Sequence, residues 1–167
     1  MHLTTKLQKV LITGSSGFIG QNLCQFLSSH GISYVGIDIA SSVPSEAYDI
    51  IAVDWHSFDM SSFDAVIHLA AKVSVEESFR IPNRYYEVNV EATKNLFSAC
   101  VKQGVKKIVF ASSAAVYGDS PEEVKSVGME GRCESPYAEN KLEIEEYSRA
   151  ISNDKTEIIC LRFRQIL

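Results

Sequence analysis

Short apolar segments alternate along the chain with longer segments in which apolar residues recur at helical spacing. Several of the short segments are too uniformly apolar to have a solvated face, which is typical of strands in a parallel sheet covered on both sides. The pattern predicts strands at residues 9–13, 33–38, 50–53, 64–69, 106–112 and 156–162. It predicts helices at residues 18–30, about 83–103 and 137–151. Strand and helix therefore alternate over most of the chain.

This alternation predicts the fold class. Successive βα units joined by right-handed crossovers build an open α/β sheet with helices on both faces. We expect a doubly wound, three-layer α/β/α arrangement of the Rossmann type, with its parallel strands in the order 3-2-1-4-5-6. The crossover between the second and third predicted strands has only about a dozen residues, so it must be irregular or very short.

The helix predicted at 83–103 has two apolar stripes along its surface. One runs through Val88, Ala92, Leu96 and Ala99, and the other through Tyr86, Val90, Phe97 and Val101. One stripe can cover the sheet, so the other needs a further partner, for which a second subunit is a candidate.

Residues 114–136 contain two prolines and three glycines. They predict a long loop between two elements of the sheet. Loops of that length within a compact domain are usually functional or mobile.

Composition narrows the class of protein. The 167 residues suffice for one domain with a real core, and 46% apolar and 22% charged residues are ordinary for a soluble globular protein. A net charge of −5 gives no general reason to bind nucleic acid or an anionic membrane. No apolar run approaches the roughly 20 residues that span a bilayer, and the first strand begins too close to Met1 for a signal peptide to precede it. The cysteines are widely scattered, so we expect reduced thiols in a cytoplasmic protein without a metal site.

The stretch from Val10 to Gly20 carries the strongest functional signal. An apolar strand ends in Thr13, glycines follow at positions 14, 17 and 20, and the first predicted helix begins among them. Glycine permits a tight turn and a close approach of a ligand to the backbone. The first free N–H groups of the helix and the positive end of its dipole point at the same place, which suits a pyrophosphate. Gly14, Gly17 and Gly20 therefore indicate dinucleotide binding.

Asp38 ends the second predicted strand, where a carboxylate can accept hydrogen bonds from a ribose. This carboxylate would repel the 2′-phosphate of NADP. The next residues, Ile39, Ala40 and Ser41, offer no arginine or lysine to receive that phosphate. The sequence therefore favours NAD over NADP.

Tyr137 and Lys141 form a second candidate constellation. Pro136 can begin a helix, and a spacing of four residues then places the phenol and the ammonium one turn apart on the same face. A nearby positive charge favours the phenolate and lowers the pKa of a tyrosine from about 10. The pair can therefore accept a proton from a hydroxyl group whose carbon gives up hydride.

Ser112 and Ser113 end the strand predicted at 106–112. They place hydroxyl groups at the carboxyl edge of the sheet, where open α/β sheets bind ligands. A serine there can bond both a substrate oxygen and the tyrosine.

Taken together, these motifs resemble the extended short-chain dehydrogenases/reductases, and more closely the NAD-dependent epimerase/dehydratase family that acts on nucleotide sugars. They follow the family order from residue 10 to about residue 163 and are jointly specific. The matching motifs are Thr13-Gly14-x-x-Gly17-Phe-Ile-Gly20, His68-Leu-Ala-Ala71, Asn89 in Asn-Val-x-x-Thr-x-Asn-Leu, Ser112-Ser-Ala-Ala-Val-Tyr-Gly118 and Tyr137-x-x-x-Lys141.

The resemblance implies NAD as the cofactor and a catalytic set of Ser113, Tyr137 and Lys141. The family's acidic residue near the adenine falls here on Asp54, beside Trp55. The residues implied to contact the cofactor are Gly14, Ser16, Gly17, Phe18, Ile19, Gly20, Asp38, Ile39, Asp54, Trp55, Leu69, Ala70, Ala71, Asn89, Tyr137 and Lys141. The family's cofactor-contacting lysine aligns with Val73, so neighbouring Lys72 receives no role.

The resemblance also implies an absent part. Members of the family are considerably longer, and their second half adds a further strand and most of the nucleotide-sugar pocket. We expect residues 1–167 to form the NAD(P)-binding Rossmann domain without that C-terminal substrate domain. Because substrate positioning contributes much of an enzyme's rate, this chain should turn over little or no sugar alone.

The activity implied by the resemblance is NAD-dependent 4-epimerisation of a nucleoside-diphosphate sugar. Tyr137 takes a proton from the C4 hydroxyl, hydride passes to NAD, and its return to the opposite face of the keto intermediate inverts the carbon. Related dehydratases commonly have an Asp-Glu pair within the Ser-Ser-Ala region, which this chain lacks; this favours an epimerase over a dehydratase or reductase. Two other hypotheses stay open: a non-catalytic NAD-binding module, and an oxidoreductase acting on a small carbonyl compound. The family also implies a homodimer through the helices at 83–103 and 137–151.

Other conspicuous residues are given structural interpretations. His68 lies at a buried strand end, where a histidine is usually structural, whereas His2, His30 and His56 lack a metal-ligand spacing. Glutamates expected on solvated helix faces are Glu76, Glu77, Glu122, Glu123, Glu143, Glu145 and Glu146.

Overall fold

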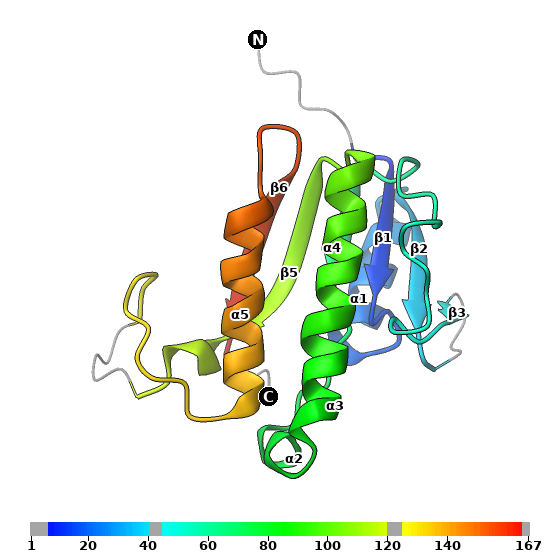
Figure 1. Ribbon diagram of the computed structural model, residues 1–167. Helices are drawn as coiled ribbons and strands as arrows, with labels where there is room; N and C mark the ends of the chain where they lie inside the picture. Colours follow the sequence, from blue (N-terminus) through cyan, green and yellow to red (C-terminus); the bar gives the residue numbers. More distant parts are fainter. Residues whose placement is uncertain (1–6, 41–44, 120–124, 165–167) are drawn as a thin grey trace.

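The computed structural model describes residues 7–40, 45–119 and 125–164. The described strands form one six-stranded parallel sheet in the order β3-β2-β1-β4-β5-β6, which confirms the predicted winding (Figure 1). The strands are β1 (Lys9–Thr13), β2 (Ser33–Asp38), β3 (Ser45–Ala47), β4 (Ala65–His68), β5 (Lys107–Ser113) and β6 (Glu157–Phe163). The helices are α1 (Phe18–Ser29), α2 (Val75–Arg80), α3 (Pro82–Tyr86), α4 (Ala92–Gln103) and α5 (Pro136–Ile151), with a π-helical turn at Glu87–Glu91 and a 3-10 turn at Ala114–Tyr117.

The predicted third strand at residues 50–53 is wrong. The third strand is β3, which pairs in parallel with the end of β2. Residues 50–53 form a turn in which the N–H of Ala52 donates to the carbonyl of Asp49 at 2.9 Å. Ile50 is buried in the core, and Ile51 packs against it. The apolar character of this segment therefore reflects a buried turn rather than a strand.

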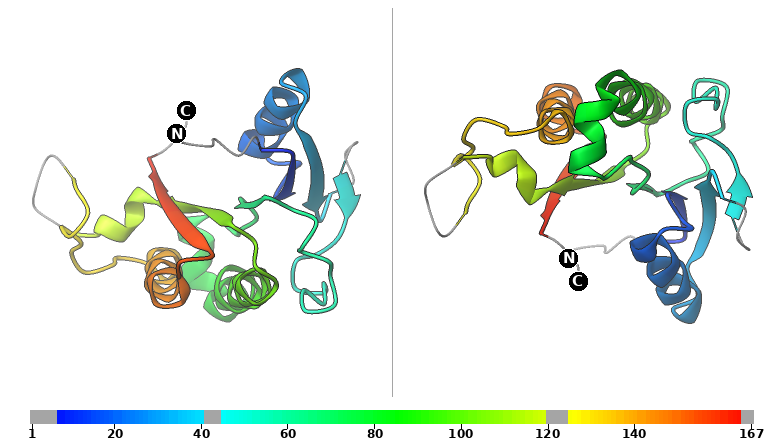
Figure 2. Two further views of the ribbon diagram at one scale, coloured as in Figure 1. Left: turned by 90° about the horizontal axis from the view of Figure 1, so that it is seen from above. Right: turned by 90° about the horizontal axis from the view of Figure 1, so that it is seen from below.

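Helices cover both faces of the sheet, as predicted. Figure 2 shows α1 on one face, whereas α4 and α5 lie side by side on the other. On the first face Val10 and Ile12 of β1 pack against Leu27 of α1. On the second face the larger core includes Ile108 of β5 together with Ile144 of α5. The cavity described below lies along the edge where the parallel strands end.

The long predicted helix at 83–103 is one continuous rod made of α3, the π-helical turn and α4 (Figure 1). Val90 and Phe97, on the stripe that was expected to need a further partner, are both fully buried within the chain. They belong to the same core as Ile144, so the neighbouring helix α5 supplies their cover. Only Tyr86 on this stripe is exposed.

The short helix α2 was not predicted. Its start is fixed by Ser74, whose hydroxyl accepts a hydrogen bond from the N–H of Glu77. A serine followed three residues later by a glutamate is a recognised motif for the N-terminus of a helix, so the sequence did contain a signal for α2. No described helix is long and apolar enough to cross a membrane.

The long loop predicted at 114–136 begins with the 3-10 turn and then folds back on itself. The N–H of Gly131 donates to the carbonyl of Tyr117 at 3.0 Å, and the N–H of Arg132 donates to the Asp119 carboxylate at 2.6 Å. Gly118 has a φ of 52°, and a Cβ there would lie 2.1 Å from the carbonyl oxygen of Arg132. The two arms of the loop are therefore in direct contact over their described parts.

Candidate functional site

A cavity of about 1270 Å³ runs along the carboxyl ends of the strands. Residues after β1, β2, β4, β5 and β6 contribute to its walls, as expected for ligand sites in doubly wound sheets. The structure brings most of the predicted site residues to this one cavity. Those that line it are Gly14, Ser16, Gly17, Phe18, Ile19, Gly20, Asp38, Ile39, Leu69, Ala70, Ala71, Ser113, Tyr137 and Lys141.

The glycine-rich turn leads from β1 into α1 at one end of the cavity. Gly14 has a φ of 76°, and a Cβ there would lie 2.6 Å from the backbone nitrogen of Ala70. Gly20 packs even more closely, because its Cβ would lie 2.2 Å from the carbonyl oxygen of Gly14. Gly17 differs, since its Cβ would meet only that same oxygen, at 3.4 Å. The first and third glycines therefore keep the turn closed, whereas the fold itself does not require the second.

Asp38 lies beside this turn and organises it. One carboxylate oxygen accepts the N–H of Ser16 at 2.9 Å, and the other accepts the N–H of Ala40 at 3.1 Å. The Ser16 hydroxyl donates to the Ala40 carbonyl at 2.9 Å. Each carboxylate oxygen has a further lone pair, so Asp38 can still accept hydrogen bonds from a ligand.

Asp54 and Trp55 are not part of the cavity wall. The indole N–H of Trp55 donates to the carbonyl of Ile50 at 3.0 Å, and its ring is buried in the core. The Asp54 carboxylate accepts a hydrogen bond from the Ser57 hydroxyl at 2.7 Å, away from the cavity. Asp49 and Ile50 line the cavity in their place. The expectation for this end of the site was therefore misplaced, because the chain turns where a strand was predicted.

Asn89 also lies behind the cavity wall. Its amide oxygen accepts the N–H of Lys72 at 2.8 Å, and its amide nitrogen donates to the carbonyl of Lys72 at 2.9 Å. Asn89 is buried and lies within the π-helical turn, a helix irregularity that often marks functional sites. It therefore holds the cavity-lining segment after β4 in place and is not itself among the residues that line the cavity.

We expect Asn89→Ala to lower the free energy of unfolding by about 1–3 kcal/mol, because it leaves both backbone groups of Lys72 without their partner. Urea unfolding of the two proteins measures the difference. Asn95→Ala, at an exposed position of α4, is the matched control and should leave the stability nearly unchanged. Equal losses of stability for both variants would contradict this role of Asn89.

Tyr137 and Lys141 lie at the start of α5. The helix begins as predicted at Pro136, and the Ser135 hydroxyl caps it by accepting the N–H of Ala138. The Lys141 ammonium donates to the carbonyl of Ala111 at 2.7 Å and lies 5.8 Å from the centre of the Tyr137 ring. The predicted helical pair therefore exists, and both side chains line the cavity.

The ionisation of this pair differs from the expectation. Burial raises the pKa of Tyr137 above its usual value of 10, although a hydrogen bond with Ser113 lowers it in part. Lys141 was expected to lower this pKa, but in the chain alone burial decides the direction of the shift. Burial also lowers the pKa of Lys141 to about 8. Both groups are therefore easier to keep neutral here than in water, and a further positive charge would favour the phenolate.

His68 is structural, as predicted. Its ring is fully buried between the Thr13 hydroxyl, 2.6 Å from Nδ1, and the Thr93 hydroxyl, 2.9 Å from Nε2. Burial, together with the positive charge of Lys141, lowers the pKa of His68 to about 3. The imidazole is therefore neutral at physiological pH.

This shift predicts a pH-dependent stability. The unfolded imidazole titrates near 6.5 and the folded one near 3, so between these values the unfolded chain binds more protons and stability falls as pH falls. We expect the free energy of unfolding to drop by about 1 kcal/mol between pH 6 and pH 5 from this residue. Urea unfolding at both pH values should show a smaller drop for His68→Gln. Equal drops would contradict the assignment.

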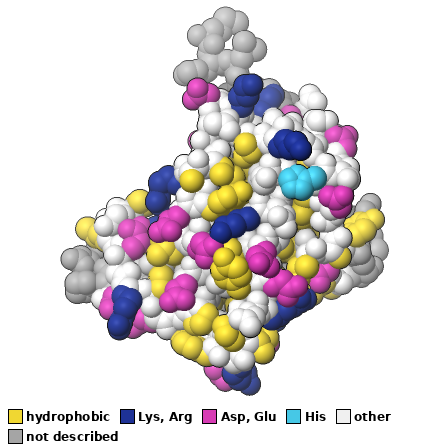
Figure 3. All heavy atoms as spheres, viewed as in Figure 1, with side chains coloured by type: hydrophobic (Ala, Val, Ile, Leu, Met, Phe, Trp, Pro, Cys, Tyr) yellow, Lys and Arg dark blue, Asp and Glu magenta, His cyan; other side chains and the backbone are white. Residues whose placement is uncertain are grey.

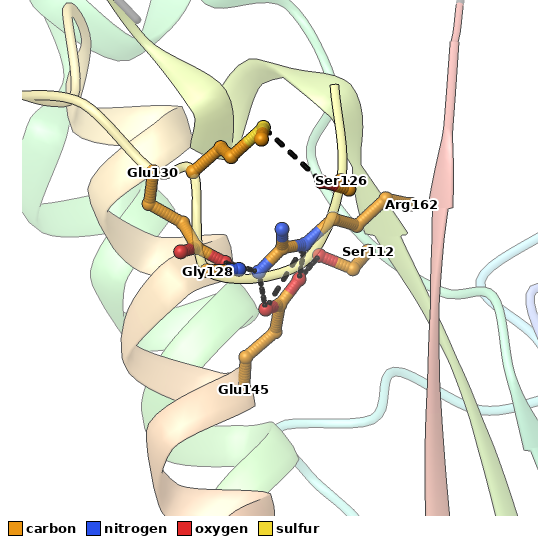
Figure 4. A network of polar contacts seen from close by, with 7 residues as sticks. Ser112, Ser126, Gly128, Glu130, Glu145 and Arg162 are labelled. Carbon is orange, nitrogen blue, oxygen red and sulfur yellow. Dashed lines mark hydrogen bonds and ion pairs between the residues drawn. The ribbon is translucent and has the colours of Figure 1, made fainter. Parts of the chain in front are cut away.

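Glu145 is buried, contrary to its expected place on a solvated face. It accepts a hydrogen bond from the Ser112 hydroxyl and a bidentate contact from Arg162, which also binds Glu130 (Figure 4). The sequence held a signal for this, because Glu145 follows Lys141 by one helical turn on the buried face of α5. No role was predicted for Arg162 from the sequence. It lies near the end of the last strand, where the apolar pattern does not show which side chains are buried.

The other expected surface carboxylates divide into three groups. Glu76 and Glu146 are exposed, whereas Glu77 binds Lys72 at 3.0 Å and Glu143 binds Lys94 at 2.5 Å. Glu122 and Glu123 lie outside the described residues, as does His2, one of the histidines expected to bind no metal. Among the described residues, no group of three or more His, Cys, Asp and Glu side chains could hold a metal ion.

Comparison with known proteins places the chain. A family model described as "NAD dependent epimerase/dehydratase family" matches residues 10–166. UDP-glucose 4-epimerase 3 of Oryza sativa subsp. japonica is 36% identical over 92% of this chain and 48% of its own length. The UDP-glucose 4-epimerase of Bacillus subtilis (strain 168) is 32% identical over 92% of this chain and 51% of its own length. The chain thus spans about half the length of the curated relatives it matches.

Solved structures agree with these matches. MoeE5 in complex with UDP-glucose and NAD superposes with a TM-score of 0.85 at 32% identity, over 93% of this chain and 54% of that chain. UDP-N-acetylglucosamine 4-epimerase from Methanobrevibacter ruminantium M1 superposes with a TM-score of 0.86 at 30% identity, over 94% of this chain and 55% of that chain. The chain therefore belongs to the NAD-dependent epimerase/dehydratase family.

Proposed function

We propose that this chain binds NAD in the cavity and carries the cofactor-binding and catalytic half of a nucleotide-sugar 4-epimerase. The observation that supports this best is that Ser113, Tyr137 and Lys141 line the same cavity as the glycine turn and Asp38. A dinucleotide lying along the cavity from the turn would then end beside the phenol. The similar proteins include several UDP-glucose 4-epimerases, so UDP-glucose is the substrate to test first.

The residues of the glycine turn fit a dinucleotide. Gly17 lines the cavity and is the N-cap residue of α1, and no side chain caps this helix. Packing does not require glycine at position 17, because a Cβ there would make only one contact, at 3.4 Å. A Cβ would, however, occupy space that a closely bound ligand needs. Free N–H groups of the first helical turn can then hold the pyrophosphate. We assign the ribose to Asp38 and the adenine end to Asp49 and Ile50.

At the other end of the cavity, each of the three candidate catalytic residues has a distinct part. Tyr137 takes a proton from the C4 hydroxyl of the sugar, with Ser113 bonded to it and positioned to orient the same oxygen. Lys141 supplies positive charge near the phenol and an ammonium to hold the second ribose. NAD supplies the acceptor, and then the donor, of hydride at the sugar carbon. The oxidised nicotinamide is positively charged, and this charge opposes the effect of burial on the Tyr137 pKa.

A titration followed by an assay tests the proposal. Calorimetric titration with NAD measures binding, and chromatography of UDP-glucose incubated with the NAD-loaded chain detects its 4-epimer. Tyr137→Phe is the control that should still bind NAD but form no product. Absence of NAD binding by the unmodified chain would overturn the proposal.

A second candidate is an NAD-binding module without catalysis. The observation that favours it is the extent of the match, which covers only about half the length of the relatives compared. Because little turnover is expected of this chain alone, a long incubation that detects trace product separates the two functions: the catalytic half forms some epimer that Tyr137→Phe abolishes, whereas a module binds NAD yet forms none. Conversion to a dehydrated or reduced sugar would instead point to another reaction of the family.

Cofactor choice gives a further prediction. We expect Asp38→Ala to improve the affinity for NADP relative to NAD by about tenfold, because it removes a negative charge from beside the 2′ position. Parallel titrations with the two cofactors measure this ratio. Asp54→Ala is the matched control: it removes a carboxylate outside the cavity and should leave the ratio unchanged. A shift with Asp54→Ala alone would contradict both assignments.

We also propose a homodimer through the outer faces of the long helix and α5. Figure 3 shows this side of the molecule, on which apolar side chains lie among charged ones. Tyr86 is 40% exposed there, and its hydroxyl donates to Glu143 of α5 at 3.0 Å. Sedimentation should give a dimer that Tyr86→Glu weakens; a monomer at all concentrations would contradict the proposal.

A further inference from the structure

Four polar side chains from four different segments meet at the end of the sheet (Figure 4). Glu145 of α5 accepts the Ser112 hydroxyl of β5 at 2.5 Å and the Arg162 guanidinium of β6 at 2.6 to 3.2 Å. Arg162 also binds Glu130, which lies in the loop that precedes α5. Arg162 is adjacent to Ser112 in the parallel register of the two strands.

Burial makes this cluster more than a surface ion pair. The side chains of Arg162 and Glu145 are only 9% and 5% exposed, and that of Glu130 is 22% exposed. The guanidinium also lies 4.7 Å from the centre of the Tyr117 ring. A buried ion pair gains little net stability over apolar packing, so its presence calls for a role other than simple stabilisation.

The cluster completes a series of ties between β5 and α5. The carbonyl of Ala111 accepts the Lys141 ammonium at 2.7 Å, and the Ser112 hydroxyl donates to Glu145. The next residue, Ser113, is hydrogen-bonded to Tyr137. Three consecutive residues at the end of the strand are thus each bonded to a side chain on one face of the helix. The first two bonds hold the end of β5 against the helix face on which Tyr137 lies.

The loop is tied to the same point. Glu130 is followed directly by Gly131, whose N–H donates to the carbonyl of Tyr117 at 3.0 Å. The ring of Tyr117 is the one that packs against the Arg162 guanidinium. Arg162 also holds the pKa of Glu130 below its ordinary value, so this carboxylate stays charged when the loop is in place.

We propose that Glu145, held by Arg162, is a positioning residue that sets Ser113 against Tyr137, and that Glu130 links the placement of the 125–135 loop to the same geometry. This inference rests on the proposed function for the identity of the reacting pair. It adds residues that act through the pair rather than on the substrate.

Tyrosine labelled with ¹³C at Cζ tests the proposal in the full chain without added cofactor. The resonance of Tyr137, assigned with Tyr137→Phe, reports the hydrogen bonding of its phenol at neutral pH. We expect Glu145→Leu to move it to the position seen in Ser113→Ala. In the Ser113→Ala background, Glu145→Leu should cause no further movement, because its effect passes through Ser113. Glu146→Gln, an exposed neighbour on the same helix, should leave the resonance unmoved.

Glu130→Gln provides a second test if Glu145→Leu fails to fold. Glu130 lies in a loop, and glutamine keeps the shape of its side chain, so this variant should fold. It should move the resonance in the same direction, by less. An unmoved resonance in the folded variants, or an equal movement with and without Ser113, would overturn the inference. The assay needs no NAD, so a chain that binds no NAD would overturn the proposed function while this measurement still stands.

Discussion

Gly20→Ala should abolish most NAD binding and cost about 3 kcal/mol of folding stability. The added Cβ would lie 2.2 Å from the carbonyl oxygen of Gly14 and 2.7 Å from Cα of Ser15. Both are backbone atoms, so α1 and the glycine turn must separate rather than a side chain rotate. Overpacking of this kind typically costs 1–3 kcal/mol. Because the same displacement opens the pyrophosphate site, we expect NAD affinity to fall by about 100-fold, or nearly 3 kcal/mol.

Gly17→Ala separates the two effects. Its Cβ would meet only one described protein atom, at 3.4 Å, and its φ of −72° suits alanine. We therefore expect the urea midpoint to stay close to that of the unmodified chain. Calorimetric titration should nevertheless show weaker NAD binding by about tenfold, because the methyl group enters the space of the ligand. If Gly17→Ala left NAD affinity unchanged, the pyrophosphate would not lie at this turn.

The predicted residues that the fold brings to one cavity are those whose positions follow from local rules. A strand, a glycine turn and a helix follow one another within a few residues, so the position of Gly14 relative to Gly20 is determined by the chain itself. The helical spacing of Tyr137 and Lys141 similarly placed both on one face of α5. Parallel strands then bring Ser113 to the same edge of the sheet without any further information.

The errors arise where tertiary contacts override the local pattern. Ile50 and its apolar neighbours have the composition of a strand, yet they fill the core from a turn. The carboxylate that lines this end of the cavity is therefore Asp49, whereas the family motif had pointed to Asp54. Asn89 shows a different limit: the motif identified an important residue, but only the structure shows that it bonds to the backbone of Lys72.

Glu145 shows why burial of charge is difficult to predict. Its position on the helix was readable, but its partner Arg162 lies on a strand that follows later in the chain. Nothing in the spacing of a carboxylate on a helix and an arginine on a strand indicates that the two will meet. The pairing depends on the packing of α5 against β6, which is a property of the whole sheet.

Arg162→Met tests the pairing of Arg162 with Glu145 and should cause a large loss of folding stability. It leaves Glu145 buried beside Glu130 with no cation between them, and loss of one partner of a buried pair typically costs about 3–5 kcal/mol. The loss should depend on pH. Arg162 lowers the pKa of Glu130 in the folded chain from its ordinary value of 4.5, so this contribution to stability is present above that value and is lost as pH falls below it. Arg162→Met removes the contribution, so its stability gap to the unmodified chain should narrow as pH falls below about 4.5.

Urea unfolding of a double-mutant cycle measures the coupling. Glu145→Leu introduced into Arg162→Met removes the unpaired carboxylate, so the double variant should be more stable than Arg162→Met alone. Arg80→Met is the surface control, because Arg80 and Glu76 form an ion pair whose side chains are 70% and 86% exposed; its urea midpoint should not move. Additive losses in the cycle, or a gap that stays constant with pH, would mean that Arg162 stabilises the fold by packing rather than by holding Glu145 and Glu130. In that case the ordering of Ser113 against Tyr137 would have to come from the Lys141 contact with Ala111 alone.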